Sequence, residues 1–143
     1  MADTMTKKQR SKLMGRIRSS GTKPEKLLRR IMEEISGVSV SRNVRKLPGT
    51  PDLYLPGLSL VVFMDGCFWH RCPVHGRLPK SRSRFWEAKL SQNVERDRAS
   101  REALRHMGMT VWSVWEHDLK PDSMSRTRRR LRRRVRRLMD RLL

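Results

Sequence analysis

The sequence predicts a single α/β domain, and three observations lead to this fold class. The chain of 143 residues, of which 36% are hydrophobic, is long enough for one core and too short for two independent ones. Segments with apolar residues at helical spacing alternate with short segments rich in β-branched residues. Glycine and proline separate many of these segments. The predicted order is therefore helix, three or four strands, helix and strand, followed by a basic tail.

The first predicted helix begins after Thr22. Thr22 is a suitable N-cap, Pro24 is tolerated in the first turn, and Glu25 completes a capping box. Apolar residues follow at helical spacing, and the helix is predicted to end near Gly37. Residues 1–21 are polar and basic and sustain no hydrophobic face, so they predict a mobile basic arm.

Three predicted strands follow, and a fourth comes late in the chain. Residues 38–46 alternate valines with polar residues, which is typical of a half-exposed strand. Residues 52–55 form a short strand between proline and glycine turns. Residues 58–64 are continuously apolar and β-branched, which predicts a strand buried on both faces. Residues 110–119 alternate again and predict the last strand.

Two helices are predicted in the second half of the chain. The first covers residues 85–107 and ends at Gly108, a suitable C′ residue. The second lies in the tail, residues 121–143, where arginine dominates while apolar residues recur at spacings of four, three and four, namely Leu131, Val135, Leu138 and Leu142. We expect this basic amphipathic helix to dock by its leucines and to grip phosphates; binding to an anionic membrane and self-association are the alternatives.

The charge of the chain indicates its partner. Lysine and arginine number 34 against 14 acidic residues, which gives a formal net charge of +20. Nucleic acid is the leading partner for such a surface, and an acidic membrane surface is the competing one. No apolar run approaches the roughly 20 residues of a membrane span, and the N-terminal residues lack the apolar core of a secretory signal. We therefore expect a cytoplasmic, nucleoid-associated protein with no membrane partner.

The segment GCFWHRCPVHG, residues 66–76, predicts a structural zinc site. Cys67, Cys72 and His75 supply three ligands close together, and tetrahedral zinc needs a fourth. His117 comes at the end of the last strand, and it reaches this loop if that strand lies beside the buried one. A disulfide is disfavoured, because the two cysteines would close a very small loop and the cytoplasm keeps thiols reduced.

The same segment carries aromatic residues that have two interpretations. Phe68 and Trp69 either fold back into the core or insert between bases, where stacking contributes about 1–3 kcal/mol per base. His70 lies beside them and is not needed for the zinc set.

Acidic residues at the strand ends suggest a second, catalytic metal. Asp52 follows Pro51 at the start of a strand, and Asp65 closes the next one. This is the skeleton of the PD…(D/E)xK nucleases, in which acidic oxygens hold Mg²⁺, and the ion polarises the scissile phosphate and activates water. The lysine of that pattern is absent, since Asp65 runs into Gly66. A different base is required, and His70 is nearby.

Four motifs together resemble one family. LPGTPDLYLP, VVFMDGCFWHRCPVHG, FWEAKLSQNVERDR and VWSVWEHDL, in this order, are similar to the very-short-patch repair (Vsr) DNA mismatch endonucleases, over about residues 5–120. The resemblance implies a restriction-endonuclease-like domain over residues 22–120, with a mixed central sheet flanked by helices. It implies a Mg²⁺-dependent endodeoxyribonuclease that nicks 5′ to the thymine of T:G mismatches, which arise when 5-methylcytosine deaminates.

The resemblance also implies roles for individual residues. Asp52 and the backbone carbonyl of Met64 match the protein ligands of Mg²⁺, and His70 matches the histidine that activates the attacking water. Glu25 and Asp97 match acidic residues around the metal-bound waters. From the sequence alone, Glu25 also fits a capping box, and Asp97 fits an exposed helical turn of paired charges.

The resemblance extends to residues that contact DNA, and the sequence differs from the family pattern at two positions. The arm of residues 1–21 matches a segment that clasps the duplex, and three aromatic residues match the set that wedges into DNA at the mismatch: Phe68, Trp69 and Trp86. His117 stands where better-known members have a cysteine zinc ligand. Asp65 stands where some members have a histidine near the metal waters; it accepts hydrogen bonds there or simply ends the strand.

The implied substrate is duplex DNA with a T:G mismatch, and the implied functional partners are mismatch-repair proteins and a cytosine-5 DNA methyltransferase. Two other hypotheses compete with this one. One is a related Mg²⁺-dependent nuclease of the restriction or defence type. The other is a non-catalytic, zinc-clipped nucleic-acid-binding protein, in which Asp52 and His70 would be incidental.

Overall fold

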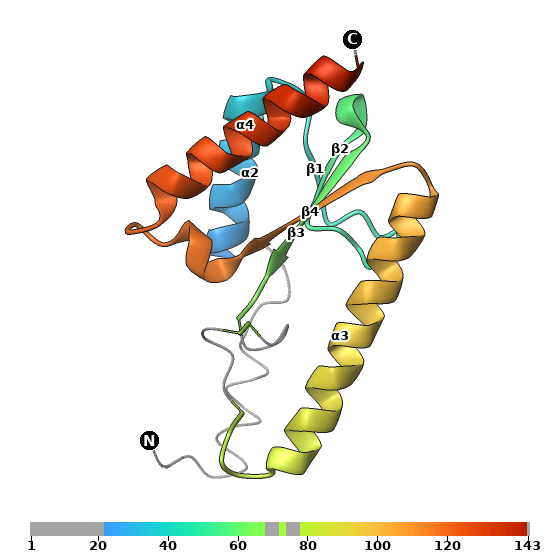
Figure 1. Ribbon diagram of the computed structural model, residues 1–143, viewed down its shortest axis with the longest axis vertical. Coiled ribbons are helices and arrows are strands. Elements are labelled where there is room, and N and C mark those ends of the chain that lie inside the picture. The colour runs from blue at the N-terminus through green and yellow to red at the C-terminus, as the bar shows by residue number, and fades with distance from the viewer. Residues whose placement is uncertain (1–21, 68–71, 74–77, 143) are drawn as a thin grey trace.

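A central sheet lies between helices on both of its faces (Figure 1). The computed structural model describes residues 22–67, 72–73 and 78–142. Four strands form the sheet in the order β1-β2-β3-β4: β1 (Ser41–Arg42), β2 (Leu53–Leu55), β3 (Leu60–Asp65) and β4 (Thr110–Trp115). Three helices accompany them: α2 (Lys23–Ser36), α3 (Ser83–His106) and α4 (Met124–Leu142). The α/β prediction is confirmed.

The sheet is mixed. β1 pairs antiparallel with β2, and β2 pairs antiparallel with β3. β3 and β4 are parallel neighbours, and α3 makes the crossover between them. Because of this parallel pairing, the carboxyl ends of β3 and β4 lie side by side, with Asp65 opposite Trp115.

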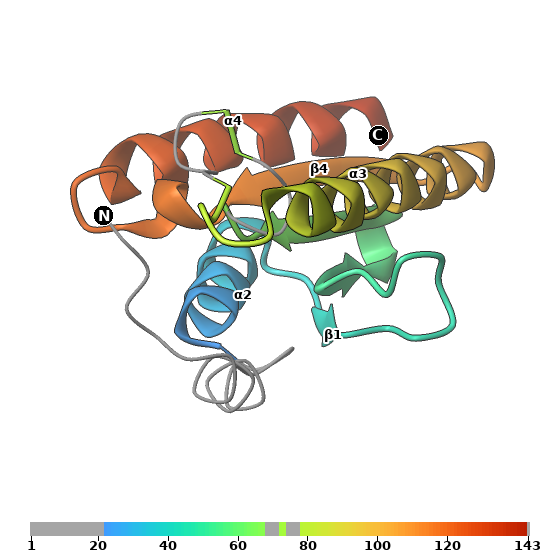
Figure 2. The ribbon, with the colours of Figure 1, turned by 90° about the horizontal axis from the view of Figure 1, so that it is seen from below.

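Each face of the sheet has its own apolar cluster. Helices α2 and α4 cover one face, on the larger cluster, and α3 covers the other (Figures 1 and 2). Successive residues of β3 therefore serve different layers: Val62 packs toward α2 and α4, and Phe63 packs with Leu104 of α3. The predicted burial of this strand on both faces is confirmed.

The first helix begins and ends as predicted. The Thr22 hydroxyl accepts a hydrogen bond from the Glu25 N–H at 3.4 Å. Gly37 ends the helix with φ of 67°, a left-handed conformation that glycine adopts without strain.

The strand predicted over residues 38–46 is wrong for most of its length, since only Ser41–Arg42 pair. The partner strand is only three residues long, and Asn43 turns the chain with φ of 47°. Val38 and Val40 still pack against the core cluster, which accounts for the alternation in the sequence.

Both longer strands are shorter than predicted. Pro56–Leu58 form a 3₁₀ turn, so β3 begins at Leu60 rather than at Leu58. β4 ends at Trp115, and Glu116–Leu119 form a second 3₁₀ turn, η2, in which the Asp118 carboxylate accepts a hydrogen bond from the Trp115 N–H at 3.4 Å. His117 therefore lies in this turn and not in the strand.

The two later helices differ in how they meet the core. α3 begins at Ser83, two residues before the predicted start, and its N-terminal half extends beyond the end of the sheet (Figure 1). α4 packs on the core by one face, and its buried residues are Thr127, Leu131, Val135 and Leu138. Leu142 is exposed, contrary to the predicted leucine face. Across the described part of the chain, no helix is long and apolar enough to cross a membrane.

Candidate active site and metal centre

Asp52 lies where the start of β2 meets the end of β3. These strands are antiparallel, so residues just before β2 face residues at the end of β3. The Met64 N–H donates a hydrogen bond of 2.7 Å to Oδ2 of Asp52. The structure thus brings together the two residues predicted to bind Mg²⁺, through the N–H of Met64; its carbonyl as a metal ligand stays a prediction.

The turn before Asp52 is anchored to α3. Gly49 has φ of 75°, and a Cβ atom built there would lie 2.8 Å from Cβ of Ser100. A side chain at this position would therefore both strain the backbone and collide with α3. The glycine allows the close contact that fixes the chain two residues before Pro51-Asp52.

Three acidic groups surround this point. Glu25 is only 8% exposed, and its carboxyl group forms a hydrogen bond with that of Asp52. Asp65, 3% exposed, adds its negative charge. Burial raises the pKa of Asp52 from 3.8 to about 7; the Met64 N–H opposes this rise, and the charges of Glu25 and Asp65 add to it. A proton or a cation is therefore favoured here at neutral pH.

Asp65 faces a cation on α3. Nη2 of Arg101 lies 2.7 Å from Oδ1 of Asp65, and the guanidinium lies 4.9 Å from the ring centroid of Phe63. Both contacts follow from the alternation of β3, which turns Phe63 and Asp65 toward α3. The charge of Asp65 is thus balanced by a guanidinium group on α3.

Asp97 lies on the same helix, one turn before Arg101. It lines a surface pocket of about 270 Å³ with Asp65 and Arg101, and the other lining residues are Val94, Arg98, Arg105 and Trp115. The structure therefore brings the predicted acidic residues together in two groups, Glu25 with Asp52 and Asp97 with Asp65. Arg101 was missed, although its spacing of four from Asp97 on a predicted helix was a usable signal.

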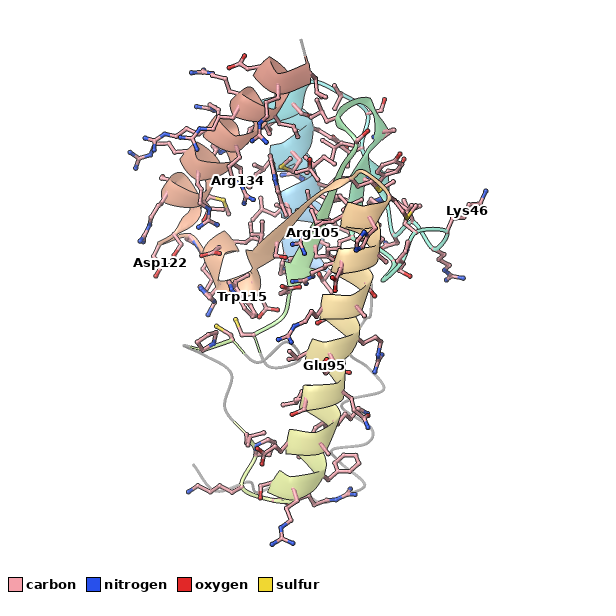
Figure 3. The ribbon with its side chains drawn as sticks, turned by 45° about the vertical axis from the view of Figure 1, so that its right-hand side comes forward. Lys46, Glu95, Arg105, Trp115, Asp122 and Arg134 are labelled. Carbon is pink, nitrogen blue, oxygen red and sulfur yellow. The ribbon has the colours of Figure 1, made fainter. Side chains whose placement is uncertain are left out.

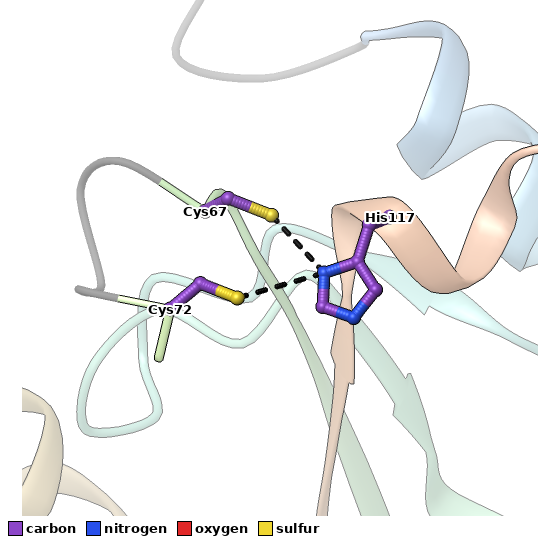
Figure 4. Close-up of side chains that lie close together, drawn as sticks. All are labelled: Cys67, Cys72 and His117. Atoms are coloured by element: carbon purple, nitrogen blue, oxygen red, sulfur yellow. Dashed lines mark hydrogen bonds between the residues drawn. The ribbon is translucent and has the colours of Figure 1, made fainter. Parts of the chain in front are cut away.

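On the other side of Asp65, Cys67, Cys72 and His117 form a compact group (Figure 4). Their ligand atoms all lie within 4.8 Å of one another. Nδ1 of His117 is 3.3 Å from Sγ of Cys67 and 3.6 Å from Sγ of Cys72. Tetrahedral zinc, with bonds of about 2.3 Å to sulfur and 2.0–2.1 Å to nitrogen, separates such ligands by about 3.5 Å. The donor set and the spacing fit a metal ion of this kind.

The parallel strands position this group. Asp65 is the register partner of Trp115, and Cys67 and His117 each follow two residues later. The Cys72 N–H donates to the Cys67 carbonyl at 2.8 Å, which closes the loop toward His117. The segments that follow β3 and β4 therefore meet as predicted, although His117 lies in a 3₁₀ turn.

Neighbouring side chains orient the His117 ring. It stacks on Trp115 with ring centroids 6.2 Å apart, and its Nε2 lies 3.6 Å from Oδ1 of Asp118. A carboxylate facing the second ring nitrogen is the usual arrangement around a metal-bound histidine, because it fixes the tautomer. Burial raises the pKa of Cys67, with a further contribution from Cys72, so metal binding must displace protons from the thiols.

Several predicted site residues lie outside the part of the chain that the structure describes. They are Phe68, Trp69, His70 and His75. The predicted base, the fourth zinc ligand and two of the three predicted wedges therefore stay predictions, as does the arm of residues 1–21.

Trp86, the third predicted wedge, is 8% exposed. Its neighbour Phe85 is 43% exposed, with ring centroids 5.3 Å apart. The guanidinium of Arg82 lies 4.3 Å from the Phe85 ring centroid, so an aromatic and cationic pair stands at the start of α3. The family resemblance implies a wedge role for Trp86 and not for Phe85, although Phe85 is the more exposed of the two.

Comparisons with known proteins agree with this arrangement. The family model described as DNA mismatch endonuclease Vsr matches residues 2–75, a segment that contains Glu25, Asp52 and Asp65. The chain is 40% identical over 121 residues to the Type II nicking enzyme V.XorIIP of Xanthomonas oryzae pv. oryzae, covering 83% of this chain and 88% of the relative.

Two further relatives are similar over most of their length. The Type II nicking enzyme V.NmeAIP of Neisseria meningitidis is 39% identical over 130 residues, covering 90% of this chain and 91% of the relative. The DNA mismatch endonuclease Vsr of Escherichia coli K12 is 37% identical over 124 residues, covering 84% and 77%. These matches define the class as DNA endonuclease. The chain belongs to the DNA mismatch endonuclease Vsr family.

Proposed function

We propose that this protein nicks one strand of duplex DNA 5′ to the thymine of a T:G mismatch, in a reaction that depends on Mg²⁺. The observation that carries the proposal is the hydrogen-bonded pair Asp52–Glu25 at the end of β3, in a family of mismatch endonucleases. In a chain of net charge +20, a buried acid held against a half-buried one marks a place that favours a bound cation.

The residues present fit Mg²⁺. This ion takes oxygen ligands and usually keeps several waters, so that one or two carboxylates suffice. Asp52 would bind it with the carbonyl of Met64, and Glu25 would hold a coordinated water by a hydrogen bond. When bound, the ion would polarise the scissile phosphate and lower the pKa of the attacking water.

The other proposed steps belong to the chain's own residues. The Met64 N–H holds one oxygen of Asp52 and so orients the carboxylate. His70 takes the proton of the attacking water, the bond between phosphorus and the 3′-oxygen breaks, and the 3′-oxygen gains a proton from solvent. The products are 3′-hydroxyl and 5′-phosphate ends. Asp65 and Asp97 support the waters on the α3 side of the site.

The Cys₂His group has a structural role in this proposal. Cys67, Cys72 and His117, with His75, would hold zinc, and the ion would supply a fixed tetrahedral connection between the loop and η2. Phe68, Trp69 and Trp86 would open the duplex at the mismatch. The zinc centre is thus separate from the chemistry, which belongs to Asp52.

The architecture and biological setting follow the same proposal. Residues 22–120 form the catalytic domain, of restriction-endonuclease-like fold, and residues 1–21 clasp the duplex. The parallel pair β3–β4 after an antiparallel β2–β3 pair is compatible with such a fold. The mismatch arises from deaminated 5-methylcytosine, so a cytosine-5 DNA methyltransferase acts before this protein. Mismatch-repair proteins are the other functional partners, and the protein acts at the nucleoid.

A nicking assay tests the proposal. A duplex with one T:G mismatch and its T:A control carry a label on the thymine strand, and each is incubated with and without Mg²⁺. We expect one nick, 5′ to the mismatched thymine, only with Mg²⁺ and only in the T:G duplex. A polymerase should extend the 3′ end of the nick, and a phosphatase should remove its 5′-phosphate.

A second function remains in competition because two of the relatives described above are named Type II nicking enzymes. A nuclease of the restriction type would nick both duplexes at a sequence of its own. Equal nicking of the T:G and T:A duplexes would therefore favour that function. Binding to both without nicking would contradict the enzyme and favour a non-catalytic DNA-binding protein.

A further inference from the structure

A row of arginines on α4 is not used by the proposed reaction. The guanidinium groups line a shallow groove of about 330 Å³ on the surface, and the lining residues are Arg126, Arg129, Arg130, Arg133, Arg134 and Arg137. We call this set the arginine groove. Figure 3 shows many long side chains of α4 with their nitrogen atoms toward the outside of the molecule, whereas Arg134 lies over Trp112 of β4.

The arrangement of these arginines depends on the fold of α4 and not only on the high arginine content of the tail. Its members recur at helical spacings of three and four, on a face of α4 different from the one that packs on the core. Thr127 and Leu131 are fully or almost fully buried on that other face. Docking by the apolar face thus fixes which arginines are presented together.

Two members of the groove are held in place by neighbours. Nη2 of Arg130 lies 3.3 Å from Oδ2 of Asp118, and the guanidinium of Arg134 lies 4.4 Å from the ring centroid of Trp112. Burial lowers the pKa of Arg134, and the adjacent charge of Arg130 lowers it further. Such crowding is relieved when an anion approaches both groups.

The other four members, Arg126, Arg129, Arg133 and Arg137, have no carboxylate partner among the residues that the structure describes. Arg128, outside the groove, is different: its Nη1 lies 2.8 Å from Glu34 of α2. The groove therefore concentrates positive charge that the described part of the molecule does not neutralise.

We propose that the arginine groove binds the sugar–phosphate backbone of the duplex beside the nicking site. Arg126 and Arg137 are eleven residues apart, which corresponds to about 16 Å along the helix, and duplex DNA rises by about five base pairs over this length. Guanidinium groups bind phosphate oxygens in bidentate fashion. A row of them contacts the backbone without reading bases.

The position of the groove favours the DNA that the enzyme is already holding. The Thr127 hydroxyl donates to the Asp118 carbonyl at 2.6 Å, and Arg130 contacts the Asp118 side chain, so α4 begins beside the turn that carries His117. A duplex that lies across the strand ends can continue along α4. An anionic membrane is a poorer partner, because a membrane-bound helix inserts its apolar face, and the apolar face of α4 is occupied by the core.

Two matched double variants of the full chain test this inference. Arg133→Gln/Arg137→Gln removes two members of the groove, and Arg132→Gln/Arg136→Gln removes two exposed arginines one position earlier, outside it. Both pairs have the same spacing, charge change and helix propensity. Each is combined with Asp52→Asn so that DNA stays intact, and affinity for a fully paired duplex is measured across a salt series.

We expect the groove variant to lower the slope of log Kd against log salt by about 1.8, because each phosphate contact contributes about 0.9. The control variant should change the slope by less than about 0.5. Equal slopes for the two variants would overturn the proposal and leave only a general charge effect. Circular dichroism and thermal unfolding establish that both variants fold; if the groove variant does not, Arg126→Gln/Arg129→Gln replaces it.

The same variants are measured with duplex RNA and with vesicles containing phosphatidylserine. A loss on vesicles or RNA alone, with the DNA slope unchanged, overturns the proposal. The inference depends on family membership and duplex binding and not on mismatch chemistry. If the wild type failed to nick T:G duplexes while the groove variant still lowered the slope, the proposed function would fail and the groove would stand.

Discussion

The two side-chain clusters on either side of Asp65 have opposite chemistry although the same strand positions both. Asp52 and Glu25 form an oxygen-rich group near the end of β3, and Cys67, Cys72 and His117 form a sulfur and nitrogen group two residues beyond it. Hard oxygen ligands suit Mg²⁺, whereas thiolate and imidazole suit zinc. The ligand atoms alone thus allow two neighbouring sites to select different metal ions, even though the sites lie close together.

The clusters also differ in the contacts that hold them. In the acidic pair, Asp52 accepts a hydrogen bond from the Met64 N–H, and its carboxyl group forms a hydrogen bond with that of Glu25. The Cys67, Cys72 and His117 cluster is held by the register of β3 and β4. The His117 ring also stacks on Trp115 and faces the Asp118 carboxylate. We therefore expect changes in the first cluster to alter catalysis and changes in the second to alter stability.

The largest effect should come from Asp52. Asp52→Asn keeps the shape of the side chain but removes the negative charge that binds Mg²⁺ and orients its waters. We expect the nicking rate at T:G to fall by about 10²–10⁴-fold with duplex affinity retained. Single-turnover nicking and anisotropy measure the two quantities, and an equal loss of both would mean that Asp52 acts on binding and not on the reaction.

Cys72→Ala should separate the second cluster from the first. The buried thiol is one of the four side chains proposed to hold zinc, so the variant should lose bound zinc and at least about 2 kcal/mol of unfolding free energy. Metal analysis and thermal unfolding are the measurements. Full zinc content in this variant, or an unfolding temperature that a chelator does not lower in the wild type, would contradict the structural role of the group.

The Asp65–Arg101 ion pair lies between the clusters, and each single variant should remove one of its two charges. Asp65→Asn and Arg101→Gln should each cost up to about 3 kcal/mol, while the double variant should cost less than the sum. Denaturant unfolding of the four proteins gives the coupling energy. A coupling near zero would show that the pair contributes nothing, and Asp65 would then be available for the metal-bound waters.

Local signals account for what the sequence predicted well. The ends of α2 at Thr22 and Gly37 could be predicted because helix caps depend on a few neighbouring residues. The burial of β3 could be predicted from its run of apolar residues. The failures are non-local. The strand predicted over 38–46 is limited by a partner of three residues, and Leu142 lies past the part of α4 that the core covers.

The candidate site shows the same division. Residue types and spacing pointed to Cys67, Cys72 and His117, because few side chains bind zinc. The contacts of Glu25 with Asp52 and of Asp65 with Arg101 join positions far apart in the chain, and no periodicity encodes them. From the sequence, Glu25 fitted a helix cap as well as a metal site; the position of its carboxyl group against Asp52 depends on how α2 packs on the sheet.

The smallest effect concerns pH and tests the raised pKa of Asp52. The pKa of Asp52 rises from 3.8 in the unfolded chain to about 7 in the folded one. Between these values the folded state binds more protons than the unfolded state, so this group makes the protein less stable as pH rises from about 4 to about 7, with no further change above. Without added Mg²⁺, the free energy of unfolding of Asp52→Asn should therefore exceed that of the wild type at pH 8 by about 1–2 kcal/mol, and the difference should shrink toward pH 5.

Thermal unfolding at several pH values measures this effect, with Asp122→Asn, an exposed acid in the turn before α4, as the control. Adding Mg²⁺ should stabilise the wild type and not Asp52→Asn, because the ion replaces the proton on the acidic pair. A difference that is constant with pH, or that Asp122→Asn reproduces, would mean that the pKa of Asp52 is not raised in the folded protein. Of the two clusters, the one formed by Cys67, Cys72 and His117 would then be the stronger candidate for a metal site.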